Sequence, residues 1–219
     1  MIFLNFKTYK SGTGEEALVM AKTIEEVGRK SGVKIISVVQ AADIRDVVSE
    51  ISTEVWTQKI DPVEFGAHTG SILPEAVADD GAVGTFLNHS ENRFLNFETL
   101  CKAHDRAKEV SLKTLIFAKD LSELEEISGL KPDYISYEPP ELIGNKDVSV
   151  ATVEPETIAK ASLISKNSGV PLIVGAGVHS FSDVVKCLEL GAVGVAVASD
   201  VMNAIDPKKE LLDLARGFK

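Results

Sequence analysis

The sequence has little cysteine and no long apolar run. Its 219 residues include only two cysteines, Cys101 and Cys187, which lie far apart and form no C-x-x-C pair. This usage predicts neither a disulfide framework nor a zinc site, and it fits a reducing compartment. No apolar stretch reaches the ~18 residues of a membrane span, and the first residues lack the layout of a signal peptide. We therefore expect a cytoplasmic protein that binds no membrane.

Positive charge is also scarce. The chain has 23 Lys and Arg residues against 33 Asp and Glu residues, a net charge of −10. This balance argues against a nucleic-acid partner, whose binding needs a basic surface. A small anion is still compatible with the chain if a local pocket supplies backbone amides and a Lys or Arg. Since no His, Asp or Glu cluster has metal-ligand spacing, we expect neither a metal nor a cofactor.

Apolar runs typical of strands recur along the whole chain. Several are β-branched and nearly continuous, as parallel strands covered on both faces are. The eight runs are 2–6, 33–39, 54–58, 83–88, 112–118, 133–138, 171–176 and 193–198. The helical patterns between them are 14–30, 42–51, 74–80, 97–110, 120–128, 155–167, 182–192 and 207–216. In the pattern at 182–192 we expect Ser182 as the N-cap and Gly191 as the C-cap.

Strands that alternate with helices predict a parallel sheet. Eight such units in 219 residues favour a single (β/α)₈ barrel domain over residues 1–219, near the lower size limit of that fold. The alternative is an open doubly wound sheet, although no G-x-G-x-x-G follows the first strand.

The carboxyl ends of the predicted strands carry the candidate site residues, which are polar or small. In a (β/α)₈ barrel these ends build the active site. The residues there are Asn5, Lys7, His89, Glu138, Gly175, Ala176, Gly177, Ala198, Ser199 and Asp200. We expect a structural and not a catalytic role for the three other histidines, His68, His104 and His179.

Glu138 opens the segment "YEPPELIG" (137–144) in an unusual way. Pro139 and Pro140 stiffen the chain directly after it, and Leu142 and Ile143 follow as apolar tips. The segment can be a lid over a carboxylate, which burial would make a stronger base. From this motif alone, the segment can equally be an ordinary surface loop with a solvated glutamate.

Together these parts suit aldose–ketose isomerisation. A base removes a proton beside a carbonyl, an electrophile polarises that carbonyl, and a lid excludes water. Small residues after the last two strands would let backbone amides hold a phosphate group.

Six segments in this order resemble the triosephosphate isomerase family, and the short archaeal-type members most closely. They are "NFKTY" (5–9), "HTG" (68–70), "GAVGTFLNHSENR" (81–93), "YEPPELIG" (137–144), "GAGV" (175–178) and "GVAVAS" (194–199). The resemblance covers nearly the whole chain. It implies the interconversion of D-glyceraldehyde 3-phosphate and dihydroxyacetone phosphate, a step of glycolysis and gluconeogenesis.

The resemblance also implies roles for individual residues. Glu138 would be the base and His89 a neutral electrophile, with its pKa lowered by a helix expected to start at 90–93. Asn5 and Lys7 would contact the substrate, and Glu91 would pair with Lys7. The phosphate group would be held by Ile143, Gly144, Gly177, Ala198 and Ser199.

Assembly and three departures complete the implications of the resemblance. The segment 61–72 would enter a neighbouring subunit of a homodimer or homotetramer. Lys146 replaces a second lid glycine, and Phe117 or Ala118 replaces a cysteine usual in relatives. Asp200 stands where short relatives have glycine; we expect it to cap a short helix at 201–204 and to point away from the pocket.

Two other classes of function stay open at this point. One is another phosphate-binding barrel isomerase or epimerase, and the other is a non-catalytic barrel of the same fold. The complete set of Asn5, Lys7, His89 and Glu138 argues against the second, because a protein without catalysis would be expected to lose at least one of them.

Overall fold

The predicted barrel is present. The structure, a computed structural model, describes residues 1–138 and 155–219. Its strands are parallel and close into one barrel in the order of the chain, from β1 round to β8. They are β1 (Ile2–Asn5), β2 (Ile35–Val39), β3 (Val55–Thr57), β4 (Gly84–Leu87), β5 (Lys113–Ala118), β6 (Tyr134–Tyr137), β7 (Leu172–Val174) and β8 (Gly194–Val197). Each lies within one of the runs predicted from the sequence.

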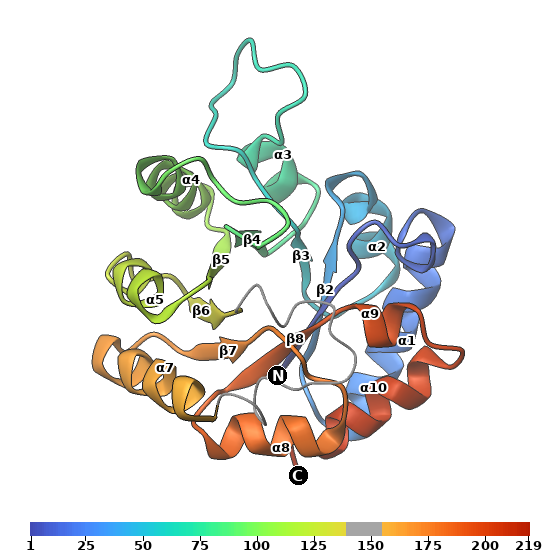
Figure 1. Cartoon of the computed structure of the whole chain (residues 1–219). Helices are drawn as coiled ribbons and strands as arrows, with labels where there is room; N and C mark the ends of the chain where they lie inside the picture. Colours follow the sequence, from blue (N-terminus) through green and yellow to red (C-terminus); the bar gives the residue numbers. More distant parts are fainter. Residues whose placement is uncertain (139–154) are drawn as a thin grey trace.

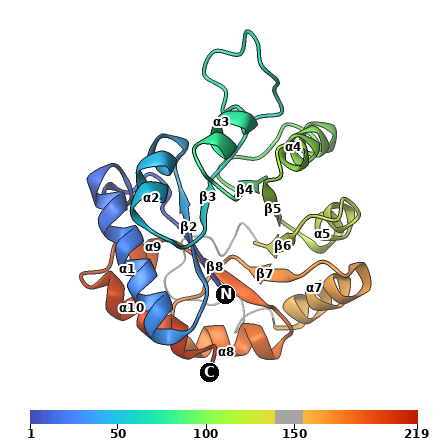
Figure 2. The ribbon, with the colours of Figure 1, turned by 180° about the vertical axis from the view of Figure 1, so that it is seen from behind.

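Helices form a ring outside the strands (Figure 1). The view from behind shows the same ring around the barrel (Figure 2). The helices are α1 (Glu15–Ser31), α2 (Ile44–Glu50), α3 (Pro74–Asp79), α4 (Phe97–Glu109), α5 (Leu121–Ser128), α7 (Pro155–Ser168), α8 (Phe181–Glu189), α9 (Ser199–Met202) and α10 (Pro207–Arg216), with 3-10 turns at Lys10–Gly12 and Ala41–Asp43. Among the described residues no helix is long and apolar enough to cross a membrane.

The predicted boundaries of α8 are wrong. Its N-cap is Ser180, not Ser182, and its C-cap is Leu190, with Gly191 following at a φ of 101°. The Ser180 side chain accepts from the Asp183 N–H, and the Asp183 carboxylate accepts from the Ser180 N–H. Because this reciprocal capping box satisfies two amide donors, the earlier serine starts the helix.

The inside of the barrel is filled by large apolar side chains. Phe3 packs edge-on against Trp56 with ring centroids 5.0 Å apart, and Phe86 packs against Phe117 at 4.8 Å. Gly84 faces Trp56 so closely that a Cβ there would lie 2.4 Å from the indole ring. The filled interior leaves the carboxyl ends of the strands as the place for a pocket.

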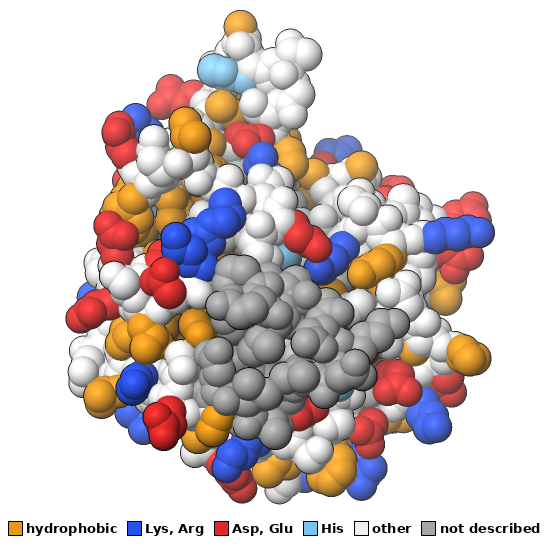
Figure 3. Space-filling model, in the orientation of Figure 1, with side chains coloured by type: hydrophobic (Ala, Val, Ile, Leu, Met, Phe, Trp, Pro, Cys, Tyr) orange, Lys and Arg blue, Asp and Glu red, His pale blue; other side chains and the backbone are white. Residues whose placement is uncertain are grey.

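The segment 61–72, between β3 and α3, projects from the barrel (Figure 1). Its ends are tied together, since the backbone of Asp61 donates to the Ile72 carbonyl at 2.9 Å and its carboxylate accepts from the Ile72 N–H at 2.8 Å. Arg106 on α4 donates to the Val63 carbonyl at 3.1 Å. Phe65 at the outer part is 76% exposed. The base of the segment is therefore fixed, while Phe65 is exposed to solvent. The segment projects beyond the rest of the surface (Figure 3).

Candidate active site

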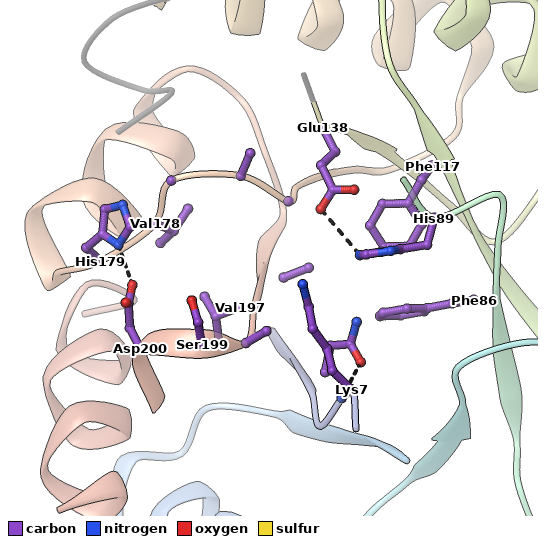
Figure 4. Close-up of a pocket in the computed structure, with 16 residues that line it drawn as sticks. Lys7, Phe86, His89, Phe117, Glu138, Val178, His179, Val197, Ser199 and Asp200 are labelled. Atoms are coloured by element: carbon purple, nitrogen blue, oxygen red, sulfur yellow. Dashed lines mark hydrogen bonds and ion pairs between the residues drawn. The ribbon is translucent and has the colours of Figure 1, made fainter. Parts of the chain in front are cut away.

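One pocket gathers most of the predicted site residues at the carboxyl ends of the strands (Figure 4). Its described lining is Asn5, Lys7, Phe86, His89, Phe117, Glu138, Gly175, Ala176, Gly177, Val178, His179, Ala196, Val197, Ala198, Ser199 and Asp200. Residues after β1, β4, β6, β7 and β8 therefore meet in one place, although they are far apart in the chain.

Glu138 directly follows β6 and is almost fully buried, with 6% of its surface exposed. Its backbone N–H continues the barrel ladder by donating to the Ala118 carbonyl at 2.9 Å. The carboxylate oxygen Oε1 lies 3.6 Å from His89 Nε2 (Figure 4). The second oxygen, Oε2, is buried and has no hydrogen-bond partner among the described residues. A carboxylate held in this way has an oxygen free to accept a proton.

His89 follows β4 and Asn88, and its ring orientation is fixed by the backbone. The Glu91 N–H donates to His89 Nδ1 at 3.2 Å. Because Nδ1 is an acceptor here, the neutral ring carries its hydrogen on Nε2. Nε2–H therefore faces the pocket and Glu138 as a hydrogen-bond donor.

The pKa of His89 is lowered, first of all by burial, and Lys7 lowers it further while Glu138 and Glu91 oppose the shift. The direction agrees with the expectation from the sequence, but the expected cause is wrong. Residues 90 and 91 form a turn, and α4 begins at Phe97, so no helix starts directly after His89. Desolvation of the ring, not a helix dipole, keeps the imidazole neutral.

Asn88 and Phe117 hold the His89 corner of the pocket. Asn88 has a φ of 61°, donates to the Phe117 carbonyl at 3.0 Å and accepts from the Phe94 N–H at 3.2 Å. The Phe117 ring packs edge-on against His89, with centroids 4.9 Å apart. This packing excludes water from one side of the imidazole and restricts its ring.

Lys7 lies in a turn with a φ of 45°, a conformation that non-glycine residues rarely adopt. Its N–H donates to Asn5 Oδ1 at 3.0 Å, and its carbonyl accepts from Gln58 Nε2 at 2.8 Å. These two bonds stabilise the strained turn from both sides. The side chain reaches the pocket, where Nζ lies 2.7 Å from Glu91 Oε1. The structure thus places Glu91 against Lys7 in a neighbouring cavity that also contacts Asn5 and His89.

The other end of the pocket is made of small residues. Gly177 has a φ of 61°, which a side chain would strain. Ala198 is the N-cap of α9, with no side-chain hydrogen bond. The first amides of a helix have no partner within it, so those of Ser199 and Asp200 can face an anion.

Two expectations about this end are wrong. Asp200 lies inside α9 and caps nothing, and it lines the pocket instead of pointing away. Its carboxylate contacts Nδ1 of His179 directly (Figure 4). His179, assigned to structure from the sequence, thus lines the pocket beside Asp200. By contrast His104 lies in the wall, where Thr114 Oγ1 and the Leu130 carbonyl bond its ring, and His68 is exposed in the projecting segment.

The lid residues lie outside the described residues. This applies to Pro139, Pro140, Glu141, Leu142, Ile143, Gly144, Asn145 and Lys146. Among the residues that are described, no group of three His, Cys, Asp or Glu side chains could hold a metal ion.

Sequence reasoning missed Gln58, and it did not expect His179 to line the pocket. Gln58 directly follows β3, so a search of every strand end for polar residues would have found it. A Cβ on Gly175 would lie 2.8 Å from Ser136 Oγ and 3.4 Å from Glu138 Oε1. That close approach had no signal beyond the glycine itself.

The chain is similar to known proteins in both sequence and fold. A family model described as triosephosphate isomerase matches residues 1–216. The triosephosphate isomerase of Methanobacterium bryantii is 42% identical over 216 residues, which cover 98% of this chain and 95% of that protein. That of Saccharolobus solfataricus is 41% identical over 214 residues, 97% of this chain and 93% of that protein. A solved structure, the triosephosphate isomerase from Bartonella henselae, shares the fold with a TM-score of 0.72 at 18% identity, covering 98% of this chain and 95% of that one.

Proposed function

This chain belongs to the triosephosphate isomerase family and interconverts D-glyceraldehyde 3-phosphate and dihydroxyacetone phosphate, and we propose that Glu138, His89 and Lys7 carry out that reaction. The observation that supports these roles is the approach of Glu138 Oε1 to His89 Nε2, 3.6 Å apart in a buried pocket that Lys7 also lines.

Glu138 moves the proton. Its carboxylate forms an O–H bond as the C–H bond beside the substrate carbonyl breaks, and the electron pair passes to the carbonyl oxygen. The product is an enediolate. Return of the proton from Glu138 to the neighbouring carbon completes the aldose–ketose exchange, with no oxidant or reductant consumed. The unpartnered Oε2, buried beside the pocket, is the oxygen that we assign to this step.

His89 stabilises the charge that develops. Its Nε2–H faces the space beside Glu138 and can donate to the oxygen that gains charge. A neutral imidazole is suited to this because it can also pass that hydrogen between the two oxygens of the enediolate. The burial that lowers its pKa keeps the ring in this form.

Lys7 and Asn5 bind the reacting end of the substrate. The Lys7 ammonium supplies positive charge to the anionic intermediate, and its bond to Glu91 holds it at the pocket edge. Asn5, which fixes the Lys7 turn, lines the same end. We assign the phosphate group to the opposite end, to Gly177, Ala198 and Ser199, together with Ile143 and Gly144 of the lid.

We also propose a homo-oligomer, a dimer or a tetramer, that assembles through the segment 61–72. The tied base of the segment and the exposed Phe65 support this proposal. Residues 1–219 would form one catalytic domain, because the described strands belong to one closed barrel. We place this domain in the cytoplasm.

Catalysis in D₂O tests the assignment of the proton step. A base that shuttles the proton between two carbons exchanges it with solvent, so the product should carry deuterium on carbon when isomerisation is followed by proton NMR. The unmodified chain should show turnover and incorporation, and Glu138→Gln should lose both. Incorporation at an undiminished rate in Glu138→Gln would remove Glu138 from the mechanism.

Light scattering of the unmodified chain measures the oligomeric state, and a monomer would contradict the proposed assembly.

A further inference from the structure

The phosphate end of the pocket has an electrostatic problem. The described charged side chains that line the pocket are Lys7, Glu138 and Asp200. The positive one, Lys7, is already paired with Glu91. A phosphate dianion that enters the pocket meets the carboxylates of Glu138 and Asp200, and like charges within one pocket repel each other.

His179 bears on that problem through a direct contact. It follows Gly177 and Val178 on the loop after β7, whereas Asp200 lies on α9 after β8, so the contact joins two loops of the pocket. Nδ1 faces the carboxylate (Figure 4). The other nitrogen, Nε2, is buried and has no hydrogen-bond partner among the described residues.

The loop that carries His179 is held in place independently of the ring. The His179 N–H donates to Asp183 Oδ2 at 3.1 Å, and the same carboxylate belongs to the capping box of α8. The side chain is therefore presented from a fixed backbone. Its contact with Asp200 is an addition to that structure and not a requirement for it.

We infer that His179 and Asp200 act as a coupled pair that makes the pocket receptive to the substrate phosphate. The hydrogen bond from His179 directs the Asp200 carboxylate toward the imidazole and lowers its effect on an anion bound at Gly177 and Ser199. Without His179, the unpaired carboxylate repels the phosphate group. When the Asp200 charge is removed as well, binding recovers. The inference rests on the proposed placing of the phosphate group at this end of the pocket.

A double-mutant cycle tests the pair, with inorganic phosphate as the probe and titration calorimetry as the measurement. His179→Ala should weaken phosphate binding by roughly tenfold at low salt and less at high salt, the scale of one partly screened unit charge. Asp200→Asn should bind phosphate at least as tightly as the unmodified chain. The affinity of the double variant for phosphate should be within about twofold of that of Asp200→Asn alone, because Asp200→Asn already removes the carboxylate on which His179 acts.

Two controls separate this role from a structural one. Asp206→Asn makes the same charge change at the N-cap of α10, outside the described pocket lining, and should leave phosphate affinity as it is. In kinetics, His179→Ala should raise KM for glyceraldehyde 3-phosphate more than it lowers kcat. Thermal unfolding checks that each variant is folded. If His179→Ala does not fold, His179→Asn takes its place in the cycle.

Additivity would overturn the inference. If His179→Ala weakens phosphate binding equally with Asp200 present and in the Asp200→Asn background, the two residues are not coupled. An unchanged affinity in His179→Ala would also overturn it. These outcomes differ from failure of the proposed function, which would appear as absent triose interconversion in the unmodified chain even if phosphate binding showed the coupling.

Discussion

Two imidazole–carboxylate pairs line the same pocket, and they differ in how closely the partners meet. His89 Nε2 and Glu138 Oε1 are 3.6 Å apart, beyond hydrogen-bond distance, and the two side chains are 11% and 6% exposed. His179 and Asp200 are in direct contact, with side chains 26% and 29% exposed. The first pair leaves a donor and an acceptor for a substrate, whereas the second satisfies its carboxylate internally.

The gap in the first pair has a structural cause. His89 is held by the Glu91 N–H and by Phe117, and Glu138 is held by the barrel ladder. The imidazole of His89 would lose its contacts with the Glu91 N–H and Phe117 if it moved toward Glu138. In the second pair the bond to Asp200 is the one hydrogen bond of the His179 ring among the described residues. In the proposed mechanism, preorganisation and not the residue types alone separates the catalytic pair from the pair that neutralises charge.

The same acid-to-amide exchange in each pair gives the largest contrast. Glu138→Gln keeps the side-chain size but removes the base, and kcat should fall by roughly 10³-fold or more. Glu138→Asp retracts the carboxylate by about 1 Å and should lower kcat by roughly a hundredfold. Asp200→Asn should change kcat by less than about tenfold, since it removes no reacting group. Steady-state kinetics of the three variants measure the contrast, and similar losses in Glu138→Gln and Asp200→Asn would abolish it.

The two histidines should differ in the kinetic constant that they affect. His89→Gln replaces the proposed imidazole donor by an amide that cannot pass a proton between the oxygens of the enediolate, so kcat and kcat/KM should fall together by roughly 10²-fold. His179→Ala should act mainly on KM. The measurement is a full substrate curve for each variant in both reaction directions. A rise in KM with undiminished kcat in His89→Gln would contradict the assigned role.

Gly175 offers a way to shift the first pair without removing either member. A Cβ there would lie 2.8 Å from Ser136 Oγ, which must shift, and 3.4 Å from Glu138 Oε1, which is an ordinary contact. Gly175→Ala should therefore displace the carboxylate through Ser136, by a few tenths of an ångström. We expect kcat to fall by roughly tenfold. Ser136→Ala in the same chain removes the closest atom and should restore part of the rate. No recovery in the double variant would show that Ser136 does not transmit the displacement.

His104 is a buried imidazole that bonds a carbonyl and a hydroxyl in place of a carboxylate. Burial, the largest cause, lowers its pKa below the ordinary 6.5. The folded state therefore binds fewer protons than the unfolded state below about pH 6.5, and the free energy of unfolding decreases as pH falls through that range. The loss from one proton is at most about 1.4 kcal/mol per pH unit. Urea denaturation at pH 7.5 and 5.5 should show a smaller decrease for His104→Gln, and an equal decrease would contradict this.

The smallest expected effect is a change in the titration of His89. Glu138 raises the pKa of His89 against the larger lowering by burial. Glu138→Gln should therefore lower that pKa further, which NMR titration of labelled histidine can follow, with His89→Gln to assign the signal. A higher pKa in Glu138→Gln would mean that the two groups do not interact as their distance indicates.

Much of the fold was predictable because it depends on local pattern. The continuous apolar runs identified the eight strands of the described residues, and their alternation with helices identified the barrel. Position at a strand end then selected Asn5, Lys7, His89 and Glu138, which do line one pocket. The cap of α8 was misassigned since Ser180 and Ser182 are both plausible caps in sequence. Only the reciprocal bonds with Asp183 decide between them.

The sequence by itself determined the order of the strands and the chemistry carried at their ends, because each depends on residues next to one another. The tertiary structure decided the pairings. His179 and Asp200 are 21 residues apart and come from separate loops, and they meet because β7 and β8 are neighbours in the closed barrel. Burial of His89, the cause of its lowered pKa, likewise depends on Phe117 and Glu138 from other strands. Distances and desolvation are properties of the packed chain, so no reading of adjacent residues could supply them.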